Sequence, residues 1–159
     1  MKILIVMGSK SDLPVMEAAA GILNDFGVEN EMRILSAHRC PDEVGELAKS
    51  ARDNGVAAII AGAGMAAHLA GVIAAHTTLP VIAVPLAASL SGMDSLLAMV
   101  QMPPGIPVPT MGIGKAGAKN AGLVAVQMLS ITDKGLADKM AKYREDMKAD
   151  VLKADSELR

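Results

Sequence analysis

Short runs of apolar residues alternate along this chain with segments whose apolar positions recur at helical spacing. The runs cover residues 2–7, 29–35, 57–61, 80–85 and 107–111. Between them, helices are expected from Pro14 to Gly27, from Pro41 to Asn54, and over about 64–76, 92–101 and 116–130. Strands that are apolar throughout and alternate with helices are typical of a parallel sheet buried on both faces. The pattern therefore predicts an α/β fold, a three-layer αβα sandwich with a central parallel five-stranded sheet.

Residues 134–159 have a different character from the rest of the chain. They are rich in charge, and their apolar residues form a narrow stripe: Leu136, Met140, Tyr143, Met147 and Val151. Such a stripe predicts a C-terminal helix that packs on its own domain or on a neighbouring subunit, and the alternative is a partly frayed surface helix. No repeat, linker or low-complexity segment interrupts the chain, so we expect one domain over residues 1–159.

Composition and charge narrow the class of protein. Apolar residues make up 52% of the chain, but there is one Phe, one Tyr and no Trp, so the core must be aliphatic. The formal net charge of −2 gives no general attraction to nucleic acid or to an anionic membrane. A single cysteine, Cys40, excludes a disulfide within the chain and suits a reducing compartment. Because no apolar stretch is long enough to span a membrane, we expect a cytoplasmic protein.

Open parallel sheets bind ligands outside the carboxyl ends of their strands, and that rule selects four loops. These loops cover residues 8–12, 36–39, 62–71 and 87–92. They contain most of the small hydroxyl side chains near strand ends, and two of the three histidines. This clustering predicts a ligand site at one edge of the sheet.

The first loop, Gly8-Ser-Lys-Ser-Asp12, suits an anion. Ser9, Ser11 and the backbone N–H groups of the loop precede a helix N-terminus, where the helix dipole favours a phosphate group. The alternative is local capping, with Ser11 or Asp12 as the N-cap just before Pro14. The Asp12 carboxylate could also accept hydrogen bonds from ribose hydroxyls.

The second loop, Ser36-Ala-His-Arg39, carries the strongest candidate for chemistry. The imidazole of His38 is suited to exchanging protons near neutral pH, and the planar fork of Arg39 is suited to binding phosphate or carboxylate. In the third loop, His68 is either a satisfied buried histidine or a substrate contact. Three histidines and one cysteine at these spacings do not indicate a zinc site.

Two glycine-rich segments resemble dinucleotide-binding fingerprints, but both lack the required context. For Gly62-Ala-Gly64-Met-Ala-Ala67, the position about 20 residues on that should hold an acidic ribose ligand falls in an apolar strand. Gly112-Ile-Gly114-Lys-Ala-Gly117 has Asp133 at a suitable distance, yet it follows the last predicted strand. A nucleotide cofactor is therefore the weaker interpretation.

Taken together, the loops resemble the N5-carboxyaminoimidazole ribonucleotide mutase family over nearly the whole chain. The matching motifs are Gly8-Ser-Lys-Ser-Asp12, Ser36-Ala-His-Arg-Cys-Pro-Asp42, Gly62-Ala-Gly-Met-Ala-Ala-His-Leu69, Ser89-Leu-Ser-Gly-Met-Asp-Ser-Leu96, Gln101-Met-Pro-Pro-Gly-Ile-Pro107 and Gly112-Ile-Gly-Lys-Ala-Gly-Ala-Lys-Asn-Ala121. The resemblance implies a flavodoxin-like domain assembled as a homo-octamer, with the helix at about 134–159 in subunit contacts. It implies an isomerase of purine (IMP) biosynthesis that needs no metal or organic cofactor.

The resemblance also implies roles for individual residues. His38 matches the catalytic histidine, and the substrate-binding positions fall on Ser9, Asp12 and Arg39. Ser11 and Ser36 lie where further phosphate contacts are expected. In the third loop, Gly64 and His68 are expected to line the substrate pocket.

The implied reaction moves a carboxylate from the exocyclic amine of the substrate to the imidazole C4. The N-carboxylate leaves as CO2, and C4 then attacks the same CO2. One imidazole can give a proton to the departing amine and later take one from C4. A closed pocket lined by small residues would keep CO2 from escaping and water from competing.

Four positions depart from the family's usual residues: Cys40 replaces a threonine, Met65 a glycine, Ala70 a proline and Pro109 a glycine.

A related branch carboxylates aminoimidazole ribonucleotide directly with CO2, but it lacks the Ala-Ala-His-Leu found at 66–69, so the mutase is preferred. The remaining alternatives are a non-catalytic flavodoxin-like nucleotide-binding module, for which His38→Asn would preserve function, and a dinucleotide-dependent oxidoreductase, which would bind NAD.

Overall fold

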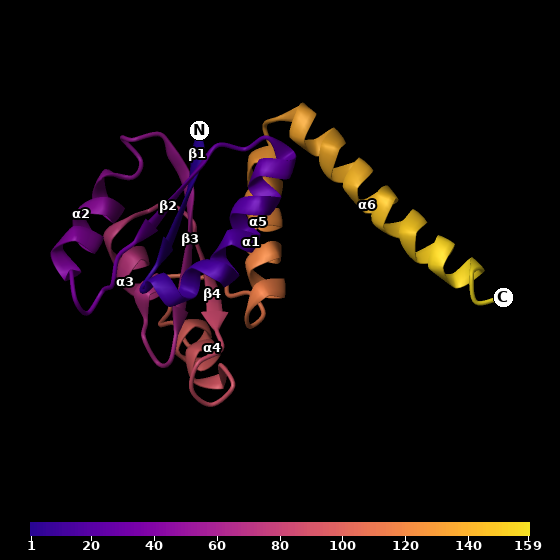
Figure 1. The fold of residues 1–159 in the computed structure, drawn as a ribbon. Coiled ribbons are helices and arrows are strands. Elements are labelled where there is room, and N and C mark those ends of the chain that lie inside the picture. Colours follow the sequence, from indigo (N-terminus) through magenta and orange to yellow (C-terminus); the bar gives the residue numbers. More distant parts are fainter.

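The computed structural model describes residues 1–159 and contains four strands, six α-helices and one short 3-10 helix (Figure 1). In chain order the elements are β1 (Lys2–Met7), η1 (Lys10–Asp12), α1 (Leu13–Phe26), β2 (Asn30–Ile34), α2 (Pro41–Ser50), β3 (Val56–Gly64), α3 (Leu69–His76), β4 (Val81–Leu86), α4 (Met93–Val100), α5 (Lys115–Ser130) and α6 (Lys134–Ser156). No helix is both long and apolar enough to cross a membrane.

The strands form one parallel sheet in the order β2-β1-β3-β4, with helices on both faces. Helices α1 and α5 cover one face, while α2 and α3 cover the other (Figure 1). The predicted three-layer αβα sandwich is therefore confirmed.

Alternation along the central strand β1 explains why both faces are apolar. Ile3, Ile5 and Met7 belong to the cluster under α1 and α5, whereas Leu4 and Val6 belong to the cluster under α2 and α3. Successive side chains of a strand point to opposite faces, so a strand covered on both sides must be apolar at every position.

The predicted fifth strand at 107–111 is wrong. The segment runs beside β4, but it makes only one isolated bridge, between Ala83 and Thr110. The Ala83 N–H donates to the Pro109 carbonyl at 2.8 Å, and the Met111 N–H donates to the Ala83 carbonyl at 2.9 Å. Because Pro107 and Pro109 have no N–H to donate, the hydrogen-bonded ladder cannot extend, and the sheet has four strands.

Strand β3 is longer than the predicted run at 57–61, because it continues through Gly62 to Gly64. These glycines belong to the strand and not to the start of a helix. A Cβ at Gly62 would overlap the buried thioether of Met16 in α1. Gly62 therefore allows α1 to pack directly on the end of the central sheet.

The predicted C-terminal helix exists as α6, and only its first part packs on its own domain. Tyr143 contacts Phe26 with ring centroids 5.6 Å apart, and the Lys139 ammonium donates to the Phe26 carbonyl at 2.9 Å. Further along the stripe, Met147 and Val151 are exposed, and the helix projects away from the domain (Figure 1). The second part of the stripe therefore has no partner within the chain.

Candidate functional site

The parallel registers bring the four candidate loops to one edge of the sheet. Met7 at the end of β1 is paired with both Ile34 and Gly62, and Gly64 is paired with Leu86. The chain leaves each strand at this edge, so the loops at 8–12, 35–40, 65–68 and 87–92 begin beside one another. The structure therefore brings the predicted loops together.

The first loop is organised by its two serines. Ser9 caps η1, and its hydroxyl accepts the Ser11 N–H at 3.3 Å, while the Ser11 hydroxyl lies 2.9 Å from the Ser9 oxygen. Asp12 occupies the N-cap position of α1, but its side chain makes no capping hydrogen bond. The expected capping of α1 by Ser11 or Asp12 is therefore wrong: Asp12 holds the N-cap position without a capping bond, and the residue that caps a helix here is Ser9, on η1. The carboxylate of Asp12 stays available for a ligand.

The surroundings of Asp12 act on its charge in opposite directions. Burial raises the pKa of this carboxyl above its ordinary value, while hydrogen bonds from Ser9 and Ser11 and the charge of Arg39 lower it. Burial is the largest of these effects. A carboxylate that is partly removed from water gains more from hydrogen-bond donors, such as sugar hydroxyls, than an exposed one does.

Arg39 joins the second loop to the first. Its guanidinium Nη2 donates to the Gly8 carbonyl at 2.7 Å, and the rest of its fork is exposed. His38 lies next to it in the turn and is also exposed. The guanidinium of Arg39 therefore reaches the loop that holds the serines and Asp12, and the exposed His38 lies next to Arg39 in the adjoining turn.

The turn that carries His38 is closed by hydrogen bonds between Ser36 and Cys40. The Ser36 carbonyl accepts the backbone N–H of Cys40 at 2.9 Å and its thiol at 3.1 Å, and the Ser36 N–H donates to the same sulfur at 3.1 Å. The side chain of Cys40 thus holds the turn, which the sequence did not predict. The only sign of this role in the sequence is that Cys40 directly follows Arg39.

His68 lies in a tighter environment than His38. Its Nε2 is 2.9 Å from the Met102 sulfur, and its Nδ1 is buried without a hydrogen-bond partner. The ring lies over Gly71, where any Cβ would overlap it. Burial lowers the pKa of His68, which favours the neutral imidazole. The contact with Met102, 34 residues away, was not predicted.

The remaining predicted residue, Gly64, lies where the third and fourth loops meet. A Cβ built at Gly64 would be 3.2 Å from the Cβ of Ala88, so the two loops are already in close contact. Immediately after it, Met65 has a left-handed backbone with φ of 58°. This conformation suits the glycine that usually occupies the position in the family that the sequence resembles.

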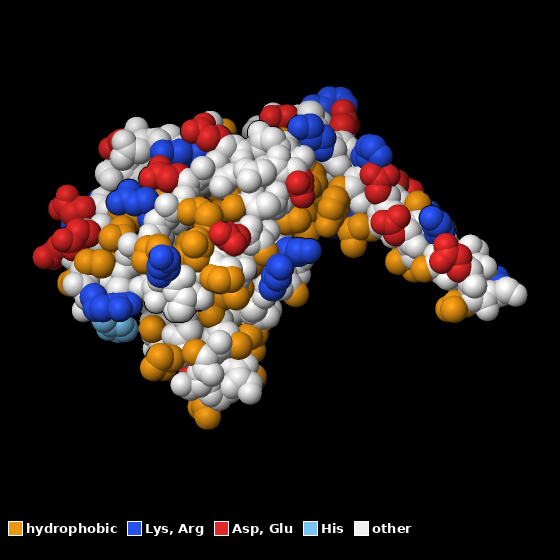
Figure 2. Space-filling model, in the orientation of Figure 1, with side chains coloured by type: hydrophobic (Ala, Val, Ile, Leu, Met, Phe, Trp, Pro, Cys, Tyr) orange, Lys and Arg blue, Asp and Glu red, His pale blue; other side chains and the backbone are white.

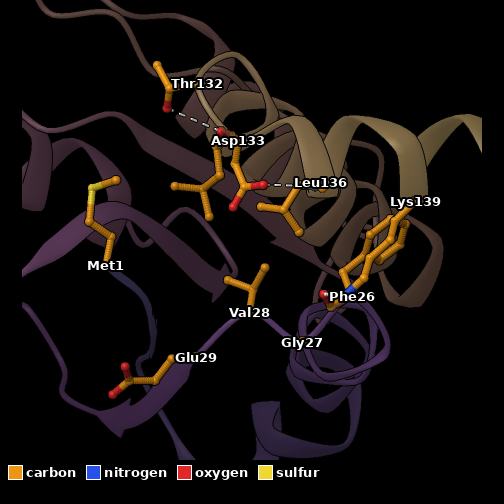
Figure 3. Close-up of a pocket in the computed structure, with 11 residues that line it drawn as sticks. Met1, Phe26, Gly27, Val28, Glu29, Thr132, Asp133, Leu136 and Lys139 are labelled. Atoms are coloured by element: carbon orange, nitrogen blue, oxygen red, sulfur yellow. Dashed lines mark hydrogen bonds between the residues drawn. The ribbon is translucent and has the colours of Figure 1, made fainter.

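A well-formed cavity lies away from these four loops. It has a volume of about 390 Å³ and lies between the start of α6 and the end of α1, with Phe26, Asp133 and Lys139 among its lining residues (Figure 3). None of the predicted site residues lines it. The candidate site is instead an open surface on the single chain. The chain brings no three His, Cys, Asp or Glu side chains together in a group that could hold a metal ion.

Fold and site together define a class: an α/β sandwich whose strand-end loops combine a turn with two serines, a histidine and an arginine. The comparison with known families narrows this class, because the AIR carboxylase family model matches residues 2–150. The chain belongs to the AIR carboxylase family.

Individual relatives agree with this assignment. The chain is 57% identical to the N5-carboxyaminoimidazole ribonucleotide mutase of Pyrococcus abyssi, over 92% of this chain and 84% of the relative. It is 54% identical to the enzyme of the same name from Bacillus subtilis, over 97% and 96% of the two chains. Among solved structures it is similar to Treponema denticola PurE, with a TM-score of 0.89 and 31% identity over 99% of this chain and 98% of the other.

Proposed function

We propose that this chain, acting as one catalytic domain over residues 1–159, is a mutase. It converts N5-carboxyaminoimidazole ribonucleotide to 4-carboxyaminoimidazole ribonucleotide in purine biosynthesis. The observation that carries the proposal is the high identity to mutases of that name over nearly the full chain. The grouping of His38, Arg39, Ser9 and Asp12 at one edge of the sheet supports it.

The first loop and Arg39 bind the ribonucleotide. Ser9, Ser11 and the adjacent N–H groups take the phosphate, with Ser36 nearby, and the exposed part of the Arg39 fork adds a positive charge. Asp12 accepts hydrogen bonds from the ribose hydroxyls, because its carboxylate is not used for capping. Gly64 and His68 bound the binding surface on the side of the third loop.

His38 moves the protons. Loss of CO2 from the N-carboxylate requires one proton at the exocyclic nitrogen, and recarboxylation releases one proton from C4. The two steps balance, so one imidazole that donates and then accepts a proton returns to its starting state. The exposed ring of His38 has no hydrogen bond within the chain that would prevent it from turning toward the substrate.

The test is the substitution His38→Asn, with His76→Asn as its matched control. His76 is the last residue of α3 and is also exposed. We expect His38→Asn to lower turnover by about 10²- to 10⁴-fold, the usual contribution of general acid–base catalysis. Substrate affinity, measured by calorimetry, should change little, and His76→Asn should behave as wild type. Turnover by His38→Asn at the wild-type rate would refute the role of His38.

We further propose that the enzyme works in the cytoplasm as a homo-octamer. Exposed apolar side chains support assembly: Met93, Leu97 and Val100 on α4, and Met147, Val151 and Leu152 on α6. Figure 2 shows apolar side chains gathered over α4 and along the side of α6 that faces the domain. Exposed apolar stripes of this kind mark interaction surfaces. Sedimentation velocity tests the proposal, and a monomer at micromolar concentration would contradict it.

A further inference from the structure

The exposed side chain of His38 makes no hydrogen bond within the chain, so the backbone of its turn determines where the imidazole lies. Before the turn, Leu35 is fixed to the sheet, because its N–H donates to the Met7 carbonyl at 2.8 Å. After the turn, Pro41 begins α2. The residues between these two anchors, 36–40, therefore set the position of the imidazole.

The turn is closed at Ser36. Its carbonyl accepts the N–H of Arg39 at 3.2 Å, and the N–H and thiol of Cys40 at 2.9 and 3.1 Å. The Cys40 sulfur also accepts the Ser36 N–H at 3.1 Å. Because a thiol is both a weak donor and a weak acceptor, one side chain bonds both backbone polar groups of Ser36. These are the only side-chain hydrogen bonds to the backbone of residues 36–40.

The thiol of Cys40 serves the turn and not the helix that follows. Cys40 occupies the N-cap position of α2, where a side chain commonly accepts an N–H from the first turn of the helix. Its side chain makes no such bond. Replacing the thiol with an apolar group therefore loosens the turn without removing a helix cap.

Arg39 has a second contact that does not depend on Cys40. Its guanidinium Nη2 donates to the Gly8 carbonyl at 2.7 Å, which holds the fork at the first loop. His38 has no comparable contact. Loss of the bonds between Cys40 and Ser36 should therefore displace the imidazole more than the guanidinium, and affect proton transfer more than substrate binding.

We propose that Cys40 is a positioning residue of the mutase reaction, whose thiol closes the turn at Ser36 and so holds the His38 imidazole in place for proton exchange. This inference rests on the proposed function. Cys40 acts through His38, and its thiol makes and breaks no bond in the reaction. General acid–base catalysis requires hydrogen-bond reach, and a misplacement of about 1 Å can cost on the order of 10²-fold in rate.

Two substitutions of similar shape isolate the hydrogen bonds of the thiol. Cys40→Thr keeps a donor and an acceptor, and threonine is the residue that usually occupies this position in the family. Cys40→Val has the same branched shape as threonine but neither a donor nor an acceptor. Cys40→Ala, which also lacks both and adds no bulk, takes the place of Cys40→Val if that variant does not fold.

Ser50→Ala is the matched control. The Ser50 hydroxyl donates to the carbonyl of Glu46, four residues earlier, at 2.8 Å. The thiol of Cys40 donates to the carbonyl of Ser36 with the same spacing. Because Ser50 is the last residue of α2 and Cys40 precedes the first, Ser50→Ala removes the same kind of bond at the far end of the same helix.

Steady-state kinetics with N5-carboxyaminoimidazole ribonucleotide gives the main result. We expect Cys40→Val to lower kcat roughly 10- to 100-fold, while substrate affinity, measured by calorimetry, changes little. Cys40→Thr and Ser50→Ala should keep most of the wild-type kcat. Thermal unfolding should show a similar fall in Tm for Cys40→Val and Ser50→Ala, roughly 3 °C each, so that lost stability alone does not explain a lower kcat.

The same substitution in a His38→Asn background tests whether Cys40 acts through His38. Two residues that act as a unit are not additive, so Cys40→Val should change the residual kcat of His38→Asn little. A further loss of roughly tenfold or more in that background would show that Cys40 acts on something other than His38, and would overturn the proposal.

The kinetics offer two further ways to overturn the proposal. Cys40→Val could keep the wild-type kcat, or Cys40→Thr could lose as much kcat as Cys40→Val does. In the first case the turn does not need the thiol, and in the second the hydrogen bonds are not what matters. A wild-type protein that forms no product would instead refute the mutase function itself, so the two failures are distinguishable.

Discussion

Because α1 packs closely against α5, we expect alanine substitutions at two glycines of these helices to change stability in opposite directions. At Gly122 in α5, an added Cβ would lie 2.9 Å from the Ala19 carbonyl oxygen and 3.0 Å from the Ile22 Cβ, both in α1. At Gly21 in α1, an added Cβ would meet nothing within 4 Å. The same substitution to alanine should therefore have opposite effects on the free energy of unfolding.

The magnitudes follow from two competing terms. Alanine in place of glycine in a helix interior stabilises by about 1 kcal/mol, and Gly21→Ala should gain most of that. Gly122→Ala gains the same amount, but a backbone oxygen cannot rotate aside, so the helices must separate by about 0.5 Å to restore a 3.4 Å contact. Overpacking of this kind costs about 1–3 kcal/mol, which leaves a net loss of up to about 2 kcal/mol.

The assay is thermal unfolding of the two variants and wild type at one protomer concentration, because assembly would make Tm depend on concentration. At roughly 3 °C per kcal/mol for a chain of this length, Gly21→Ala should raise Tm by up to about 3 °C, and Gly122→Ala should lower it by up to about 6 °C. Equal shifts for the two variants would refute the close approach of α1 and α5.

Three further substitutions test the site and α6. Burial raises the pKa of Asp12, so its charged form destabilises the fold at pH values above the ordinary pKa of an aspartate. Asp12→Asn should therefore raise Tm at pH 7, and the difference in Tm from wild type should shrink as the pH falls through the titration of Asp12. The same substitution should lower substrate affinity, measured by calorimetry, roughly 10- to 100-fold. Unchanged affinity would contradict its role. Arg39→Lys keeps the positive charge but loses the forked guanidinium group that donates to the Gly8 carbonyl. The KM measured by steady-state kinetics should therefore rise roughly tenfold. A KM equal to that of wild type would count against the role of the guanidinium group. Tyr143→Ala removes the contact between α6 and the Phe26 ring, so α6 should be cleaved faster in limited proteolysis. An unchanged cleavage rate would contradict the packing of α6 on the domain.

The sequence predicts the layers well, because burial on both faces leaves strands such as β4 apolar at every position. It fails where a local pattern has two physical explanations. The Gly62-Ala-Gly64 segment has the composition of a turn, but it continues β3 because Met16 packs against it from α1. The run at 107–111 has the apolar character of a strand, but its prolines limit pairing to one bridge.

The candidate site was predictable as a set of loops, since strand ends meet at one edge of any parallel sheet. The contacts between the loops were not. The bond from Arg39 to the Gly8 carbonyl joins residues 31 positions apart, and the sequence holds no periodic signal for it. The left-handed backbone of Met65 likewise depends on the tertiary path between β3 and α3.

One comparison of substrates tests the central claim most directly. Purified protein is given either N5-carboxyaminoimidazole ribonucleotide, or aminoimidazole ribonucleotide with bicarbonate, and formation of the C4-carboxylated product is followed. We expect rapid conversion of the first substrate, and conversion of the second only at high bicarbonate concentration. The reverse preference would make the chain a direct carboxylase, the reaction that the family's description names, and would contradict the mutase function proposed for it.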